Sequence, residues 1–175
     1  MNKFGIAGAL ALGILSSNPA LAQASASANA TGSTTIIQPV TVSKTADLVF
    51  GRVVRPATGS DTVSITNASD AVTASGGSAV PIATTGVTTS RAKFTVAGEG
   101  GQTVALTIPA NFTMTGTGTD IVVTLSSDKT GSQSLGGTLG TSSSINLNVG
   151  GSFTLAATQA TGAYTGSFTV SAAYN

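Results

Sequence analysis

The last fourteen residues of the chain, 162–175, follow a period of two. After Gly162, the even positions are apolar apart from one glycine, and the odd positions hold mainly Thr and Ser; these even positions are Tyr164, Gly166, Phe168, Val170, Ala172 and Tyr174. Because successive side chains of a strand point to opposite faces, this alternation predicts one half-buried strand. The strand reaches the last residue of the sequence, so we expect its outer edge to stay uncovered by the same chain.

Composition favours an all-β domain. Only 7% of the 175 residues are charged, and Cys and His are absent. Thr, Ser, Gly, Ala and Val dominate, whereas strong helix formers are scarce. A length of this order suits one domain with its own core, and the missing Cys means that sheet pairing and core burial alone must hold it.

Residues 1–22 have the pattern of a secretory signal peptide. Lys3 provides the positive start, residues 6–15 the apolar run, and Ala20-Leu21-Ala22 the small-residue cleavage site before Gln23. The apolar run is too short for a permanent membrane span, so we expect an exported protein without membrane insertion. Without Lys3, six basic and six acidic residues remain, and this balance gives no electrostatic signature of nucleic-acid binding.

Strand patterns recur through the middle of the chain at intervals of about 8 to 12 residues, separated by Gly and Pro, which is typical of a sandwich. The alternation predicts inward side chains at Leu48, Phe50, Val63, Ile65, Ala92, Phe94, Val96, Val104, Leu106, Ile108, Ile121, Val123 and Leu125. Short strands are expected in 67–86, at 111–114, and on both sides of Gly150-Gly151, at 144–149 and 152–155. Residues 127–140 read as a loop rich in Gly and Ser.

Residues 23–36 also keep a period of two. One face holds Ala24, Ala26, Ala28, Ala30, Gly32, Thr34 and Ile36, and the other is mainly polar. A flexible leader, which is the alternative interpretation, has no reason to maintain this period, whereas a strand that docks one face into a groove does. Since Ala is a poor strand former, the segment needs a template to become ordered.

Two motifs resemble known bacterial families. Gly162, fourteenth from the end, and Tyr174, the penultimate residue, match the carboxyl-terminal signature of chaperone-usher pilins. In addition, Leu48-Val49-Phe50-Gly51 resembles the Leu-x-Phe-Gly opening of a pilin-like domain family of secreted bacterial proteins. The row of alanines departs from the pilin pattern, in which the amino-terminal extension is often richer in Val, Ile and Leu.

The pilin resemblance implies an immunoglobulin-like β-sandwich, formed by residues 37–175, that is incomplete in the monomer. The extension 23–36 of a neighbouring copy would complete it as a donor strand, giving a homopolymer. It further implies that a periplasmic chaperone pairs with the carboxyl-terminal strand, through Gly162, Tyr164, Phe168, Val170, Ala172 and Tyr174. An outer-membrane usher would order the exchange, and the product would be a cell-surface pilus that supports adhesion or biofilm formation.

Docking of such an extension would depend mainly on the backbone. Each buried Ala methyl contributes about 0.8 kcal/mol, and Ile36 about 1.5 to 3 kcal/mol. Sheet hydrogen bonds at about 0.5 to 1.5 kcal/mol each, over about ten residues, outweigh the side chains. We therefore expect a shallow groove in which Thr34 or Ile36 is the deepest insert.

The residue inventory argues against an enzyme. Without His or Cys, most general-base, thiolate and zinc chemistry is missing, and the six acidic residues stand singly. We expect no catalytic, cofactor or metal site, and a hydrolase ranks as a distant third interpretation. The main alternative to a pilin is a monomeric secreted β-sandwich that binds carbohydrate or acts as a surface adhesin; it should expose a cluster of aromatic side chains.

Overall fold

The computed structural model describes residues 25–76, 78–82 and 87–175. The expected signal peptide, 1–22, and Ala24 lie outside the described residues. The chain divides into two compact units, residues 1–35 and 36–175. All regular structure in the described residues is β, and they contain no helix of the length and hydrophobicity needed to cross a membrane.

Twelve strands form the second unit within the described residues. They are β1 (Thr41–Ala46), β2 (Arg52–Val54), β3 (Ser60–Ile65), β4 (Val72–Ser75), β5 (Val80–Ile82), β6 (Ala92–Glu99), β7 (Thr103–Thr107), β8 (Asn111–Met114), β9 (Ile121–Ser127), β10 (Gly131–Ser134), β11 (Ser142–Ala156) and β12 (Ser171–Tyr174).

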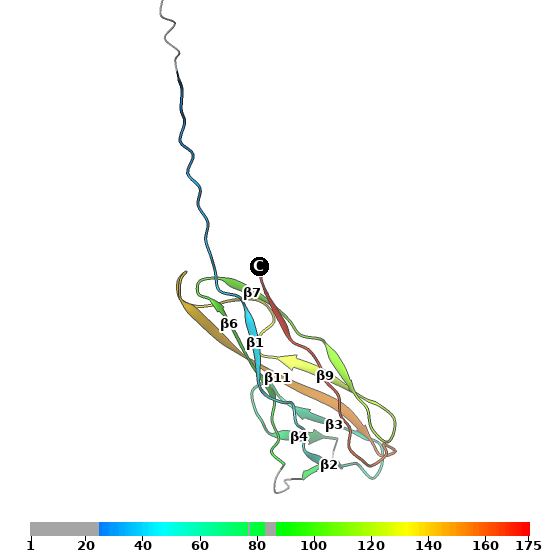
Figure 1. The fold of residues 1–175 in the computed structure, drawn as a ribbon. Helices are drawn as coiled ribbons and strands as arrows, with labels where there is room; N and C mark the ends of the chain where they lie inside the picture. The colour runs from blue at the N-terminus through cyan, green and yellow to red at the C-terminus, as the bar shows by residue number, and fades with distance from the viewer. Residues whose placement is uncertain (1–24, 77, 83–86) are drawn as a thin grey trace, which may run out of the picture. The chain divides into compact units, whose positions relative to one another are not determined.

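Every strand pair is antiparallel, and the strands make one large sheet and two small ones (Figure 1). The large sheet has the order β1-β6-β11-β3-β4, and β9 joins it by pairing with both β11 and β8. The second sheet has the order β10-β7-β12, and the third joins β2 to β5. The predicted fold class is confirmed: the chain is an all-β, antiparallel, sandwich-like domain.

A first core cluster fills the space between the large sheet and the β10-β7-β12 sheet. Its buried residues come from both sheets and the segments beside them: Ala92, Phe94, Val96, Val104, Leu106, Leu135, Leu147, Val149 and Val170. These side chains come from the alternating positions of β6, β7 and β11, as expected for facing sheets. This half of the domain is therefore a two-layer sandwich.

A second core cluster lies where the large sheet continues into β3, β8 and β9. It consists of Phe50, Val63, Ile65, Ala79, Ile121, Val123, Phe153 and Leu155. The rings of Phe50 and Phe153 meet edge to face, with centroids 5.0 Å apart. Leu48 and Leu125 pack against both clusters and join them into one core.

Most of the predicted core is confirmed. Ten of the thirteen predicted inward residues are buried, and Leu48, Ile108 and Leu125 are half-buried. Two predictions about local structure are wrong. Residues 127–140 are not only a loop, since they contain β10, which pairs with β7, and a buried Leu135. The two strands expected around Gly150-Gly151 are one strand, β11.

The glycine pair lets β11 serve two parts of the large sheet. Residues 142–149 of β11 pair with β6, residues 149–152 with β9 and residues 151–156 with β3. A Cβ atom at Gly150 would lie 2.3 Å from Ile65 O and 2.6 Å from Asn67 N. Because both atoms belong to the backbone of β3 and its turn, they have little room to move away.

We predict that Gly150→Ala destabilises the domain by at least about 1 to 3 kcal/mol, the usual cost of forcing extra atoms into a packed interior. Urea unfolding followed by circular dichroism would measure the loss. Gly136→Ala is the matched control, because the nearest atom to a Cβ at Gly136 is Ser143 Oγ at 3.9 Å. Equal midpoints for the two variants would contradict the packing argument.

Candidate functional site

The carboxyl-terminal segment alternates as predicted, but its regular strand is shorter than expected. Tyr164, Phe168, Val170, Ala172 and Tyr174 are buried or half-buried, and the intervening odd positions are exposed. Only Ser171–Tyr174, however, forms a strand, and Thr165 adds one antiparallel bridge to Thr115. The prediction of one continuous strand over 162–175 is therefore wrong in its extent and right in its buried face.

Pro109 explains where β12 begins. The register pairs Ser171 with Thr107, so the same register would place Thr169 opposite Pro109. Proline has no N–H to donate, which interrupts the ladder. Within 25–76, 78–82 and 87–175, no backbone hydrogen bond joins residues 166–170 to another segment.

The outer edge of β12 is open in the described residues. β12 stands last in the order β10-β7-β12 and pairs with β7 alone. Figure 1 shows this segment running along one side of the domain to the carboxyl terminus, beside the start of β1. An extended segment with free peptide groups on one side is the geometry to which another strand can add.

An apolar groove of about 1010 Å³ lies beside this segment. Residues 48–55 form one wall and residues 159–166 the other. Its floor is the second core cluster together with two side chains of β8, and consists of Phe50, Phe112, Met114, Ile121, Phe153 and Leu155. The groove thus exposes part of the hydrophobic core along a line where the described residues provide no strand.

Polar contacts fix the two walls of the groove. Arg55 Nη1 donates to Gln159 O at 2.7 Å and so ties one wall to the other. Gln159 Nε2 donates to Tyr164 Oη at 2.8 Å, and that hydroxyl donates to Ala160 O at 2.9 Å. These contacts hold the Tyr164 ring, which lines the groove and packs against the second cluster.

Glycines allow close approach at the second wall. Gly162 has a φ of +151°, and a Cβ there would lie 2.4 Å from Thr117 Oγ1. A Cβ at Gly116 or Gly118 would meet the Tyr164 side chain at 2.6 or 2.8 Å. The Gly116–Gly118 stretch joins the hairpin strands β8 and β9, and it also leaves space for this ring.

The predicted donor residues belong to no strand of the described chain. Ala26, Ala28, Ala30, Gly32 and Thr34 lie in a segment without regular structure and are exposed, as is Ile36 with 88% of its surface accessible. Ala24 lies outside the described residues. Their role as a donor strand therefore stays a prediction.

A polar cluster around the buried Glu99, which sequence reasoning missed, holds Gln38 at the start of the second unit. The Glu99 carboxylate, 2% exposed, accepts the Gln38 N–H at 3.0 Å and the Gly140 N–H. Tyr174 Oη accepts the Glu99 N–H at 2.6 Å and donates to Gln38 O at 2.8 Å. Both peptide groups of Gln38 are thereby held between β6 and β12; we call Glu99 and Tyr174 the Gln38 clamp.

Residues 40–174 match the protein family described as Domain of unknown function (DUF4402). The chain belongs to this family. No curated protein and no solved structure matches the sequence. The DUF4402 match includes both groove walls and β12, and it begins after the predicted donor segment.

Acidic residues of this DUF4402 chain hold backbone and basic groups in place. Asp61, 4% exposed, accepts the N–H groups of Ser78 and Ala79. Within the described residues, no three His, Cys, Asp or Glu side chains gather in a group that could hold a metal ion.

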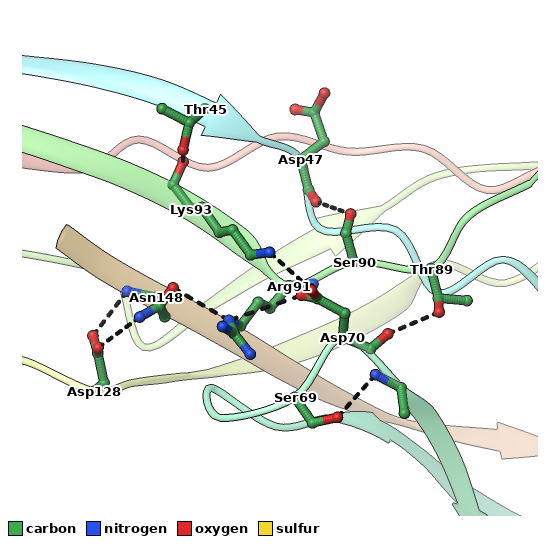
Figure 2. A network of polar contacts seen from close by, with 11 residues as sticks. Thr45, Asp47, Ser69, Asp70, Thr89, Ser90, Arg91, Lys93, Asp128 and Asn148 are labelled. Atoms are coloured by element: carbon green, nitrogen blue, oxygen red, sulfur yellow. Dashed lines mark hydrogen bonds and ion pairs between the residues drawn. The ribbon is translucent and has the colours of Figure 1, made fainter.

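A polar network covers the outer face of β6 and β11 (Figure 2). Lys93 Nζ donates to Asp70 Oδ2 at 2.8 Å, and the Arg91 side chain joins Asp70 to Asn148. The Lys93 hydrogen bond, followed by that from the Arg91 N–H, holds the pKa of Asp70 below its ordinary value of 3.8. Arg91 and Lys93 are thus both paired with Asp70 on this sheet face.

Asp128 lies at the other end of this network. Burial alone raises the pKa of Asp128, but hydrogen bonds from the Asn148 N–H, the Asn148 amide and Lys129 outweigh it, and the pKa lies below 3.8. Both carboxyl groups are therefore more stable as anions in the folded DUF4402 domain than in the unfolded chain.

We predict that Asp70 makes unfolding pH-dependent. A carboxyl whose folded pKa is lowered stabilises the fold above its unfolded pKa, and the effect is lost as pH falls through the folded value. Asp70→Asn should lower the urea midpoint at pH 7, and the difference from the unsubstituted chain should shrink below pH 3.8.

Asp120→Asn is the control for this measurement. Asp120 is exposed and makes no polar side-chain contact within the described residues. Its substitution should therefore leave the urea midpoint unchanged both at pH 7 and below pH 3.8. A difference for Asp70→Asn that is constant from pH 7 to pH 3 would contradict the role of its charge.

Proposed function

We propose that this protein is a structural subunit of an extracellular filament, a pilus that polymerises by donor-strand exchange. The observation that carries the proposal is the apolar groove of about 1010 Å³ beside a carboxyl-terminal segment with one open backbone edge. Residues 24–36 of a second copy occupy the groove and pair with that edge. This is β-augmentation, in which main-chain hydrogen bonds supply affinity and alternate side chains set the register.

Size complementarity supports this occupant. The donor face is small along Ala24–Ala30 and ends in the larger Ile36. We call the carboxyl-terminal segment, residues 159–175, the acceptor. The groove lies at its 159–166 end, whereas at the other end Tyr174 bonds to Gln38, just before β1. A donor antiparallel to β12 places Ile36 over the phenylalanine floor and the alanines toward Tyr174.

The exposed, odd-numbered residues of the carboxyl-terminal segment also suit a subunit interface. Thr165, Ser167, Thr169 and Ser171 are exposed, so the polar odd face of the acceptor stays in water while a donor adds beside it. The donor presents Ser25, Ser27 and Asn29 on its own odd face. Two strands with the same polar-out, apolar-in alternation continue one sheet without burying a charge.

Export and assembly follow from the pilin resemblance and belong to this proposal. Residues 1–22 direct the chain into the periplasm, where a chaperone occupies the open edge until an usher exchanges it for the next subunit. The filament then supports adhesion or biofilm formation at the cell surface.

The decisive experiment compares two pairs of substitutions in the mature chain, 23–175. Ala28→Asp with Ala30→Asp places two charges on the apolar, inward face of the donor, and we expect filament yield to fall at least about tenfold. The reason is that burying an unpaired polar group costs about 1 to 3 kcal/mol or more, and about 1.4 kcal/mol is a factor of ten. Sedimentation and electron microscopy measure the yield.

Ser27→Asp with Asn29→Asp is the matched control, since it adds the same charge to the outward face and should leave filaments intact. Removing residues 23–36 should abolish filaments. If the truncated and full mature chains are both monomeric and equally stable, the proposal fails and the monomeric binding module is favoured.

A further inference from the structure

Gln38 lies at one end of the domain. This position determines how residues 23–36 of the same chain could approach the groove. β6 ends at Glu99, and β1 begins at Thr41, which pairs with Ala97. Tyr174, the last residue of β12, bonds to both Glu99 and Gln38. β1 therefore starts where β12 ends, and the two strands run in opposite directions.

Self-insertion would require a reversal of the chain at Gln38. The groove walls, 48–55 and 159–166, follow β1 and precede β12, so they lie toward the opposite end of the two strands. A segment preceding Gln38 that turned back along its own β12 would run parallel to it. Its Ile36 would then lie next to Tyr174, away from the groove volume, and its alanines would face the phenylalanine floor.

Three constraints oppose that reversal. The Gln38 N–H is bound by Glu99 Oε2 at 3.0 Å, and the Gln38 carbonyl accepts from Tyr174 Oη at 2.8 Å. Pro39 restricts the residue before it to extended backbone conformations. A turn at this point must break both hydrogen bonds and leave the Glu99 carboxylate, 2% exposed, short of a donor.

We propose that the Gln38 clamp keeps the chain from inserting its own extension, so that the groove stays available to a second copy. Glu99 and Tyr174 act here as positioning residues: the Glu99 carboxylate and the Tyr174 hydroxyl act through their hydrogen bonds to Gln38. The inference rests on the proposed function, and it adds that the choice between self-insertion and polymerisation is made by these two residues.

Cross-linking can test the clamp because the chain has no Cys. Thr31→Cys and Ser167→Cys together place one thiol on the donor and one on the exposed face of the acceptor in the full mature chain. After treatment with a short bismaleimide, a link between copies gives a ladder on a denaturing gel, whereas a link within one copy gives a compact monomer.

With the clamp intact, we expect the ladder to predominate. Tyr174→Phe keeps the ring and removes the hydroxyl, and we expect the ratio of cross-linked monomer to ladder to rise roughly 2- to 10-fold, the range for one net hydrogen bond. Glu99→Gln, an independent variant, should shift the ratio in the same direction. A merely structural role would reduce both linked species together and leave their ratio unchanged.

Thr41→Val is the matched control. It removes a hydroxyl whose 3.4 Å hydrogen bond to Ala97 O lies at the same end of β1, and it leaves Gln38 untouched. An unchanged ratio in both clamp variants, or a predominance of linked monomer in the unsubstituted chain, overturns the clamp and leaves the proposed function standing. No link of either kind overturns the proposed function itself.

Discussion

The main physical constraint on this structure is a set of unpaired backbone groups close to an apolar groove. Buried or half-buried peptide groups need hydrogen-bond partners, and β12 finds them on one side only within the described residues. Natural sheets commonly protect an open edge with charged residues, proline or a covering segment. Residues 162–175 contain no charged residue and no proline, whereas β1 carries Lys44 and follows Pro39. Among the described residues, the segment that follows the groove wall thus has none of these protections on its open edge.

Side-chain hydrogen bonds fix the carboxyl-terminal segment, residues 159–175, at both of its ends. At one end Arg55 and Tyr164 hold the 159–166 wall, and at the other Tyr174 is bonded to Gln38 and Glu99. Between these anchors, Phe168 packs against Phe94 and Phe112, with ring centroids 6.1 and 5.2 Å apart. Side-chain packing therefore orients residues 166–170, whose backbone has no partner in the described part of the chain, and such preorganisation reduces the entropy lost when another strand binds.

Local patterns predicted which side chains face inward, because alternation depends only on neighbouring residues. Val63, Ile65, Phe94, Val96 and Val104 are examples. Pairing depends on distant residues and was less predictable. The start of β12 is set by Pro109 in another segment, and the continuity of β11 is set by the change of partners at Gly150 and Gly151.

For the candidate site, the sequence likewise predicted some of the inward-facing residues but not the contacts between distant residues. Leu48, Phe50 and Tyr164 were expected on inward faces, and all three line the groove. The clamp was missed because Glu99 sits in a glycine-rich turn sequence that is typical of an exposed residue, and nothing local indicates that its partners are Gln38 and Tyr174. An acidic residue at the end of a predicted strand, and a tyrosine near the end of the chain, are each too common for the sequence to indicate that they meet.

The two core clusters differ in what a second strand would do for them. The first cluster lies between two sheets, and its members that keep 6 to 9% exposure, Phe94, Leu106 and Val170, do not line the groove. The second keeps 6 to 8% exposure at Phe50, Ile121, Phe153 and Leu155, the residues that floor the groove. A strand bound there would bury this remaining surface and satisfy the open edge together, and ligands that bind only the folded state stabilise it.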